Sequence, residues 1–135
     1  MCGIASESDF QFTRPTLVHF ELNINENFNV QQDKKIELTN LIRVSIRKHK
    51  DCKEATVDLE LKIGEKSDDY PFYIYAIERA NFRWGEYFDD DTIERLLNQN
   101  APSLLLSYLR PIVAQITYAS QYAGYDVPFM DFTKK

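Results

Sequence analysis

The sequence predicts an α+β domain in which a four-stranded antiparallel sheet packs on one long kinked helix and a short helix before it. Segments between residues 15 and 82 alternate apolar and polar side chains with a period of two, as strands with one buried face do. A short turn at residues 64–69 favours antiparallel neighbours. From Asn100 to Phe132 the apolar spacing becomes helical and aromatic residues accumulate.

Length and composition bound the class of protein. A chain of 135 residues suits one domain with a core of its own, and we expect residues 1–14 to form a flexible lead and residues 15–135 a single domain. The net charge of −5 argues against nucleic acid as the main partner, because phosphate binding needs clustered positive charge. With no apolar window of about 18 residues and no leader pattern, we expect a soluble cytoplasmic protein without membrane insertion.

The first three predicted strands each have one apolar face. The first begins after Pro15 and has these alternating apolar residues: Val18, Phe20, Leu22 and Ile24. The second covers residues 36–48, with a kink or bulge expected at Asn40. The third covers residues 55–63 and leads into the turn. A single apolar face on each strand indicates a sheet that is covered on one side.

The fourth predicted strand, residues 71–82, differs because both of its faces are apolar. One face carries Phe72, Ile74 and Ala76, and the other carries Tyr73, Tyr75 and Ile77. A helix covers only one face of a two-layer domain. We therefore expect the second face to contact another subunit or to line a binding groove.

Two helices are predicted after the strands. Residues 89–99 have acidic residues in the first turn and an apolar stripe, and Asn100-Ala101-Pro102 should end this short helix. A longer helix should run over residues 103–121, with a kink at Pro111 and an end before Gly124. The aromatic surface that follows exceeds what one helix needs to dock on a small sheet, which favours contact with another polypeptide.

The sequence contains no recognisable catalytic or metal-binding set. Cys2 and Cys52, with His19 and His49, give neither a disulfide framework nor the spacing of metal ligands, and no glycine-rich phosphate loop is present. The start MCGI is similar to class II glutamine amidotransferases, in which Cys2 would be the nucleophile, but the chain is too short for that fold and lacks its downstream motifs. We expect no enzyme activity, no cofactor and no metal.

The helical third resembles one known family. APSLLLSYLR opens the long helix with alanine-proline, a leucine-rich turn and Tyr-x-Arg, at Pro102, Leu105, Tyr108 and Arg110. DVPFMDF, residues 126–132, resembles a Pro-x-Asn-Phe segment with one extra residue and Asp131 before the phenylalanine. In this order, after four strands, the motifs resemble the protein-export chaperone SecB over residues 15–132.

The resemblance implies an ATP-independent holdase that binds unfolded polypeptide clients or preproteins in hydrophobic grooves, and a homotetramer built as a dimer of dimers. The client-binding candidates are Ile42, Val44, Phe82, Trp84, Tyr122, Tyr125 and Phe129. The candidates for the oligomer interface are Leu105, Tyr108, Leu109, Ile112 and Ile116.

Two departures from the family keep other functions open. Of the acidic positions that dock the translocation motor SecA, Glu21 falls on one, whereas the others are Leu17, Tyr73 and Tyr75. The family's C-terminal helix and tail have no counterpart after Phe132. The alternatives to export through SecA are a dedicated chaperone of one client such as an antitoxin, a non-chaperone oligomeric adaptor, and a domain that binds a small apolar ligand.

Overall fold

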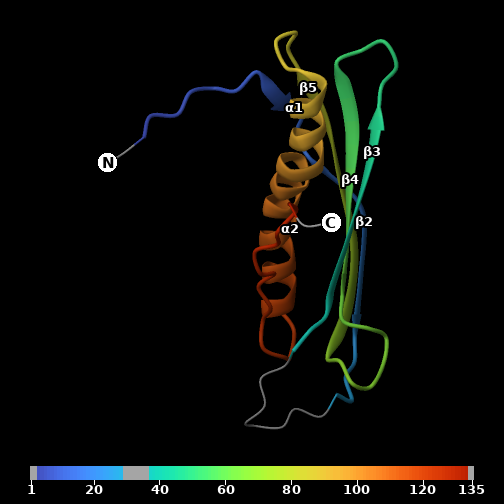
Figure 1. The fold of residues 1–135 in the computed structure, drawn as a ribbon. Coiled ribbons are helices and arrows are strands. Elements are labelled where there is room, and N and C mark those ends of the chain that lie inside the picture. The colour runs from blue at the N-terminus through green and yellow to red at the C-terminus, as the bar shows by residue number, and fades with distance from the viewer. Residues whose placement is uncertain (1–2, 29–36, 134–135) are drawn as a thin grey trace.

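A five-stranded antiparallel sheet packs on a long C-terminal helix (Figure 1). This computed structural model describes residues 3–28 and 37–133, so Cys2 and the expected strand start at Ile36 lie outside it. The elements in chain order are β1 Phe10–Phe12, β2 Thr16–Ile24, β3 Asn40–Lys48, β4 Glu54–Ile63, β5 Phe72–Trp84, α1 Asp90–Arg95, the π-helix η1 Leu96–Asn100 and α2 Ala101–Tyr118. The predicted α+β class is confirmed, with one strand more than expected.

Strand β5 is the centre of the sheet. It pairs with β4 on one side, while β1 and β2 share its other side, and β3 lies beyond β4. In the registers, Phe12 faces Phe82 and Leu22 faces Ile74. The added strand β1 lies within residues 1–14, where sequence analysis expected none. Its three residues are too few for a period of two to be recognised.

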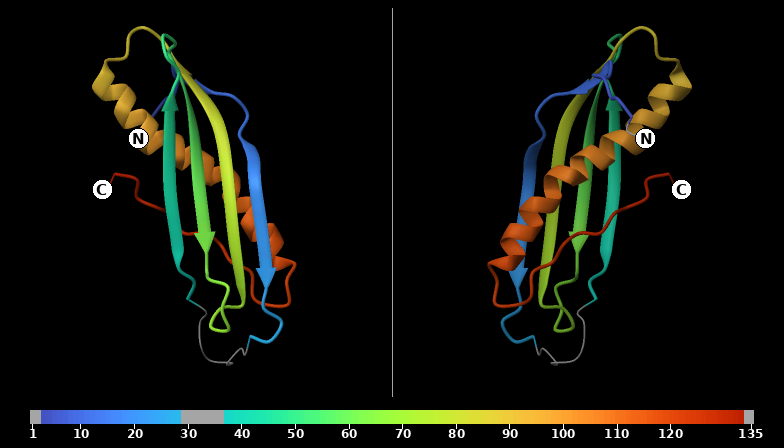
Figure 2. Two further views of the ribbon diagram at one scale, coloured as in Figure 1. Left: turned by 90° about the vertical axis from the view of Figure 1, so that its right-hand side faces the viewer. Right: turned by 90° about the vertical axis from the view of Figure 1, so that its left-hand side faces the viewer.

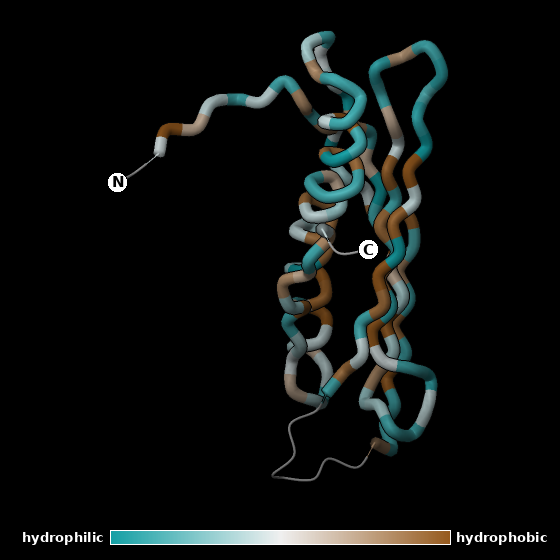
Figure 3. The backbone as a smooth tube through the Cα atoms, viewed as in Figure 1, coloured by the Kyte–Doolittle hydropathy of each residue, from teal (hydrophilic) through white to brown (hydrophobic). Residues whose placement is uncertain are grey.

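The core lies between the sheet and α2. Alternate residues of β4 and β5, such as Leu59, Leu61 and Ile74, are fully buried. Leu105 and Leu109 face them from α2, four positions apart and therefore on one side of the helix. Figure 3 shows hydrophobic residues along the strands and the helix, whereas the turns that join the strands are mainly hydrophilic.

The predicted helix break at residues 100–102 is wrong. The chain stays helical from α1 through the single π turn of η1 into α2, and the Ala101 N–H donates to the Leu96 carbonyl, the spacing of a π turn. Pro102 follows directly, in the first turn of α2, where helices tolerate proline. Pro111 lies inside α2 as expected, and the helix ends at Tyr118, earlier than predicted.

Charged side chains of β4 and of the turn after it lie over the outer face of β5. Tyr75 donates its hydroxyl hydrogen to Glu60 at 2.5 Å. The Lys62 ammonium lies 5.1 Å from the centre of the Tyr75 ring, and the Lys66 ammonium lies 5.4 Å from that of Tyr73. Long polar side chains therefore lie over the aromatic rings of this face. Its expected contact with a second subunit or a groove stays a prediction. Among the described residues, no helix is long and apolar enough to cross a membrane.

Candidate functional site: a groove beside strand β3

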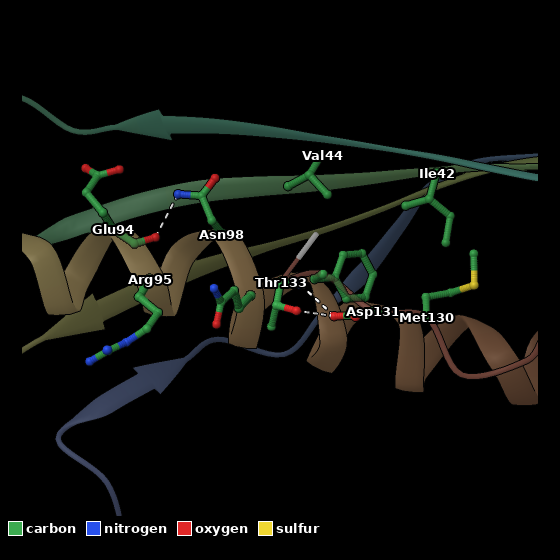
Figure 4. Close-up of a pocket in the computed structure, with 10 residues that line it drawn as sticks. Ile42, Val44, Glu94, Arg95, Asn98, Met130, Asp131 and Thr133 are labelled. Carbon is green, nitrogen blue, oxygen red and sulfur yellow. Dashed lines mark hydrogen bonds between the residues drawn. The ribbon is translucent and has the colours of Figure 1, made fainter. Parts of the chain in front are cut away.

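An open groove of about 710 Å³ lies between β3 and the α1–η1 helical segment. Its walls come from three parts of the chain that are distant in sequence. The lining residues are Ile42, Val44, Glu94, Arg95, Asn98, Gln99, Met130, Asp131, Phe132 and Thr133. Figure 4 shows the two β3 side chains on one side of this hollow and the polar residues of the helix on the other. The wall that β3 forms is therefore apolar, and the wall that the helical segment forms is polar.

The apolar wall belongs to an edge strand. Ile42, Val44 and Ile46 alternate along β3, are half-buried and pack against the core. Strand β3 pairs only with β4 among the described strands, so its outer edge offers backbone N–H and C=O groups that no other described strand uses. An extended polypeptide can bind such an edge through its backbone, while apolar side chains at every second position bind the wall.

The polar wall is formed where α1 passes into the π turn. Arg95 and Gln99 present a guanidinium and an amide to the groove, and the Asn98 amide donates to the Glu94 carbonyl at 2.7 Å. Glu94 also forms an ion pair with Lys48, which links the end of β3 to α1. This ion pair bounds one end of the groove, and the polar wall can hydrogen-bond the backbone of a bound chain.

The third wall is the segment after α2. We call residues 126–133 the tail. Figure 2 shows that the chain turns back after α2 and runs across the helical side of the sheet toward β3. Val127 is fully buried, and Arg110 of α2 donates from Nε to its carbonyl oxygen at 2.9 Å. Beyond this point, Met130 and Phe132 pack half-buried against the apolar core beside the groove.

Three of the predicted client-binding residues lie at or near the groove. Ile42 and Val44 line it directly. Tyr125 lies next to the start of the same strand, because Asn40 of β3 donates from its amide to the Tyr125 hydroxyl at 2.6 Å. Sequence analysis identified these residues from strand parity and from the aromatic content of the C-terminal third.

The other four predicted client-binding residues do not line the groove. Phe82 is 2% exposed, and Phe10 of β1 stacks on it with 5.4 Å between ring centres. Trp84 stacks on the Phe10 ring, with 6.3 Å between ring centres. Strand β1, which the sequence did not reveal, therefore covers both. Tyr122 is buried and donates its hydroxyl hydrogen to the Asn25 carbonyl. Phe129 is 90% exposed and contacts the Arg110 guanidinium, 4.8 Å from its ring centre.

The predicted oligomer interface is divided between two faces of α2. Leu105 and Leu109 are fully buried against the chain's own sheet, so they offer no surface to a second copy, and this part of the prediction is corrected. Tyr108 is 39% exposed, and Ile112 and Ile116 are half-buried at the border of the buried face. Because these three recur every fourth residue, they form one ridge along the helix.

Glu21, the predicted translocase-docking residue, is engaged within the sheet. Its carboxylate pairs with the Lys66 ammonium at 2.9 Å, and the His19 ring lies 3.8 Å away. The hydrogen bond from Lys66 holds the pKa of Glu21 below its ordinary value. The carboxylate is thus partly neutralised by its own neighbour.

Sequence analysis missed the polar wall and a buried acid. A polar helix face such as that of Arg95 and Gln99 is typical of a solvated surface, and no sequence signal places an edge strand opposite it. Glu78 lies on the helical face of β5, is 3% exposed and has one carboxyl oxygen without a partner among the described residues. Burial raises the pKa of Glu78. Its parity with Ala76 could have indicated this inward position.

The fold, unlike the sequence, has counterparts among known proteins. No protein-family model matches the chain, and no curated protein matches it. The SecB-like chaperone Rv1957 of Mycobacterium tuberculosis, solved with a ChAD peptide from the antitoxin HigA1, has a TM-score of 0.68 at 11% identity over 91% of this chain and 88% of that one. A protein of unknown function from Streptococcus agalactiae has a TM-score of 0.51 at 12% identity, covering 92% and 100% of the two chains. At these identities the likeness concerns the fold alone: the chain has a SecB-like α+β fold.

Proposed function

We propose that the protein is an ATP-independent SecB-like chaperone that binds extended segments of unfolded polypeptides along β3. The observation that carries the proposal is a strand edge that no other described strand pairs, combined with the apolar wall of Ile42 and Val44. An unfolded chain exposes both backbone groups and apolar side chains, and this groove can bind both at once. The polar wall opposite supplies further hydrogen-bond partners.

The likeness to Rv1957 supports polypeptides as the client class, because that chaperone was solved with a peptide from an antitoxin. A dedicated client and a broad set of unfolded proteins both fit the groove. Delivery to SecA is not part of the proposal, since Glu21 is engaged by Lys66 and the outer face around it also carries Arg43.

The mechanism needs no chemical step. A holdase that binds only the unfolded state lowers its free concentration and slows aggregation. Burial of client side chains contributes roughly 25 cal/mol for each Å² of apolar area, and the cost of ordering the client opposes it. Affinity for long clients should therefore come from several shallow contacts, which suits a groove that is open along one side.

We further propose that copies of the chain associate in the cytoplasm as a dimer of dimers. The support is an exposed apolar surface at the edge of the sheet opposite β3, which β2 forms. On β2, Leu17 is 43% exposed and Val18 is 45% exposed. Tyr108 on the helix ridge contacts Phe12 of β1 edge-on, so the ridge borders the same side. A surface of this kind is typical of a subunit contact.

The groove is tested by suppression of aggregation without ATP. A chemically denatured client is diluted into the protein, and light scattering is followed. We expect suppression by the wild type and by Ser45→Asp, which alters the outer face of β3. Val44→Asp should lose most of it, because a carboxylate in the apolar wall would be desolvated by the client. If the wild type suppresses aggregation of no client, or if both variants behave alike, the proposal is overturned.

A further inference from the structure

We propose that residues 128–133 of the tail are an internal occupant of the groove, which an extended client must displace. This inference rests on the proposed function and adds both a regulation and a client chemistry to it. The tail places Met130 and Phe132 beside the β3 wall that a client would use, as Figure 4 shows for Met130 and Ile42. A client and these two side chains therefore compete for the same apolar surface.

The tail is anchored up to Val127 and only weakly held beyond it. Tyr125 donates its backbone N–H to Thr117 at 2.8 Å, and Arg110 holds the carbonyl of the fully buried Val127. Beyond Val127, the hydrogen bonds of the described tail are internal, between Thr133 and Asp131. The distal tail can therefore leave the groove without breaking a hydrogen bond to the sheet or the helix.

Pro128 marks the point of release. Proline restricts the residue before it to extended backbone, so the chain leaves the anchor in a fixed direction. Past this residue, half-buried Met130 and Phe132 hold the segment to the core and the Phe129 ring contacts Arg110, while the backbone entropy of six ordered residues opposes these contacts. Because few contacts hold it, the distal tail suits a reversible occupant that a longer apolar client replaces.

The tail also indicates which clients fit. Its sequence has two bulky apolar residues at positions i and i+2, the spacing of one face of a strand, with Asp131 between them. Arg95 lies in the opposite wall and can attract an acidic group at that middle position. We infer that preferred clients contain an extended stretch of alternating large apolar residues with a polar or acidic residue between them.

The first test measures binding of a fluorescent peptide with the sequence of residues 126–133 to the full chain. Replacing both Met130 and Phe132 by serine should empty the groove and raise the peptide's affinity about tenfold, as expected if the tail occupies the groove nine-tenths of the time. The matched control is Phe129→Ser, which removes only an exposed contact of the same tail with Arg110 and should change the affinity far less. A peptide with serine at the Met and Phe positions should not bind.

A second measurement avoids the variants and uses the wild type. Met130 is half-buried, so its oxidation by dilute peroxide, mapped by mass spectrometry, reports whether the tail is displaced. Saturating unfolded client should speed the oxidation several-fold. Unchanged or slower oxidation, or equal peptide affinity in the double variant and the control, overturns the tail proposal while client capture by the wild type stands. Failure of every protein to capture any client would instead overturn the proposed function.

Discussion

The Arg110 guanidinium donates through Nε to the Val127 carbonyl oxygen at 2.9 Å and also lies 4.8 Å from the centre of the Phe129 ring. One side chain of α2 thus fixes both the path of the tail and its exposed aromatic residue. The neighbouring Val127 side chain is fully buried, so this contact determines where the tail enters the core.

Arg110→Ala should therefore destabilise the protein by about 1–2 kcal/mol, because a hydrogen bond from a charged donor is lost and the Val127 carbonyl loses its partner. Urea unfolding measures the effect. Gln115→Ala on the exposed side of α2 is the control and should change the free energy of unfolding by less than about 0.5 kcal/mol. Equal effects of the two substitutions would show that Arg110 does not anchor the tail.

Glu78 should make stability fall as the pH rises. Burial raises its pKa, so the folded protein retains the proton at a pH where the unfolded chain releases it. The stabilisation is fully present below the pKa that Glu78 has in the unfolded chain. It is lost as the pH rises through the higher pKa that Glu78 has in the folded protein. Each unit of difference corresponds to about 1.4 kcal/mol. Glu78→Gln should flatten the dependence above about pH 5 and raise the melting temperature at pH 7, relative to Glu86→Gln at an exposed position. An unchanged slope would count against a buried neutral acid.

Asp58 should have the opposite dependence. Arg79 donates to both of its carboxylate oxygens, at 2.7 and 2.9 Å, and these bonds lower the pKa of Asp58. The stabilisation is present above the unfolded pKa of about 3.9 and is lost as the pH falls through the folded value. Asp58→Asn should cost about 1–3 kcal/mol at pH 7 and much less near pH 2. Thermal unfolding across this range measures it, and a cost that does not vary with pH would exclude the ion pair as its source.

The helix ridge should control assembly. Ile112→Lys places a charge on the half-buried ridge of α2 and should lower the mass measured by light scattering, because a desolvated charge opposes a subunit contact. Gln115→Lys adds the same charge at an exposed position of the helix and should leave the mass unchanged. A monomeric wild type, or an Ile112 variant of unchanged mass, would show that the ridge is not a subunit interface.

The period-two segments predicted β4 and β5 because these two strands bury alternate residues beneath α2, as Leu59 and Leu61 do. Strand β1 escaped prediction because its three residues depend on pairing with β5 rather than on a local pattern. The break expected at Pro102 failed because a π turn accommodates the proline. One wall of the groove could be predicted, because strand parity identifies Ile42 and Val44. The polar wall could not be predicted, because the local sequence does not show which helix packs opposite β3.

The central place of β5 has a consequence for the order in which the chain folds during synthesis. Phe12 of β1 pairs with Phe82, and β2 pairs with the preceding part of the same strand. Both N-terminal strands therefore leave the ribosome before β5 is synthesised, and they stay unpaired with β5 until then. Pairing between segments this far apart in sequence costs loop-closure entropy before it gains stabilising contacts. These strands should therefore join the sheet late. Until then, the nascent protein exposes an apolar strand edge of its own.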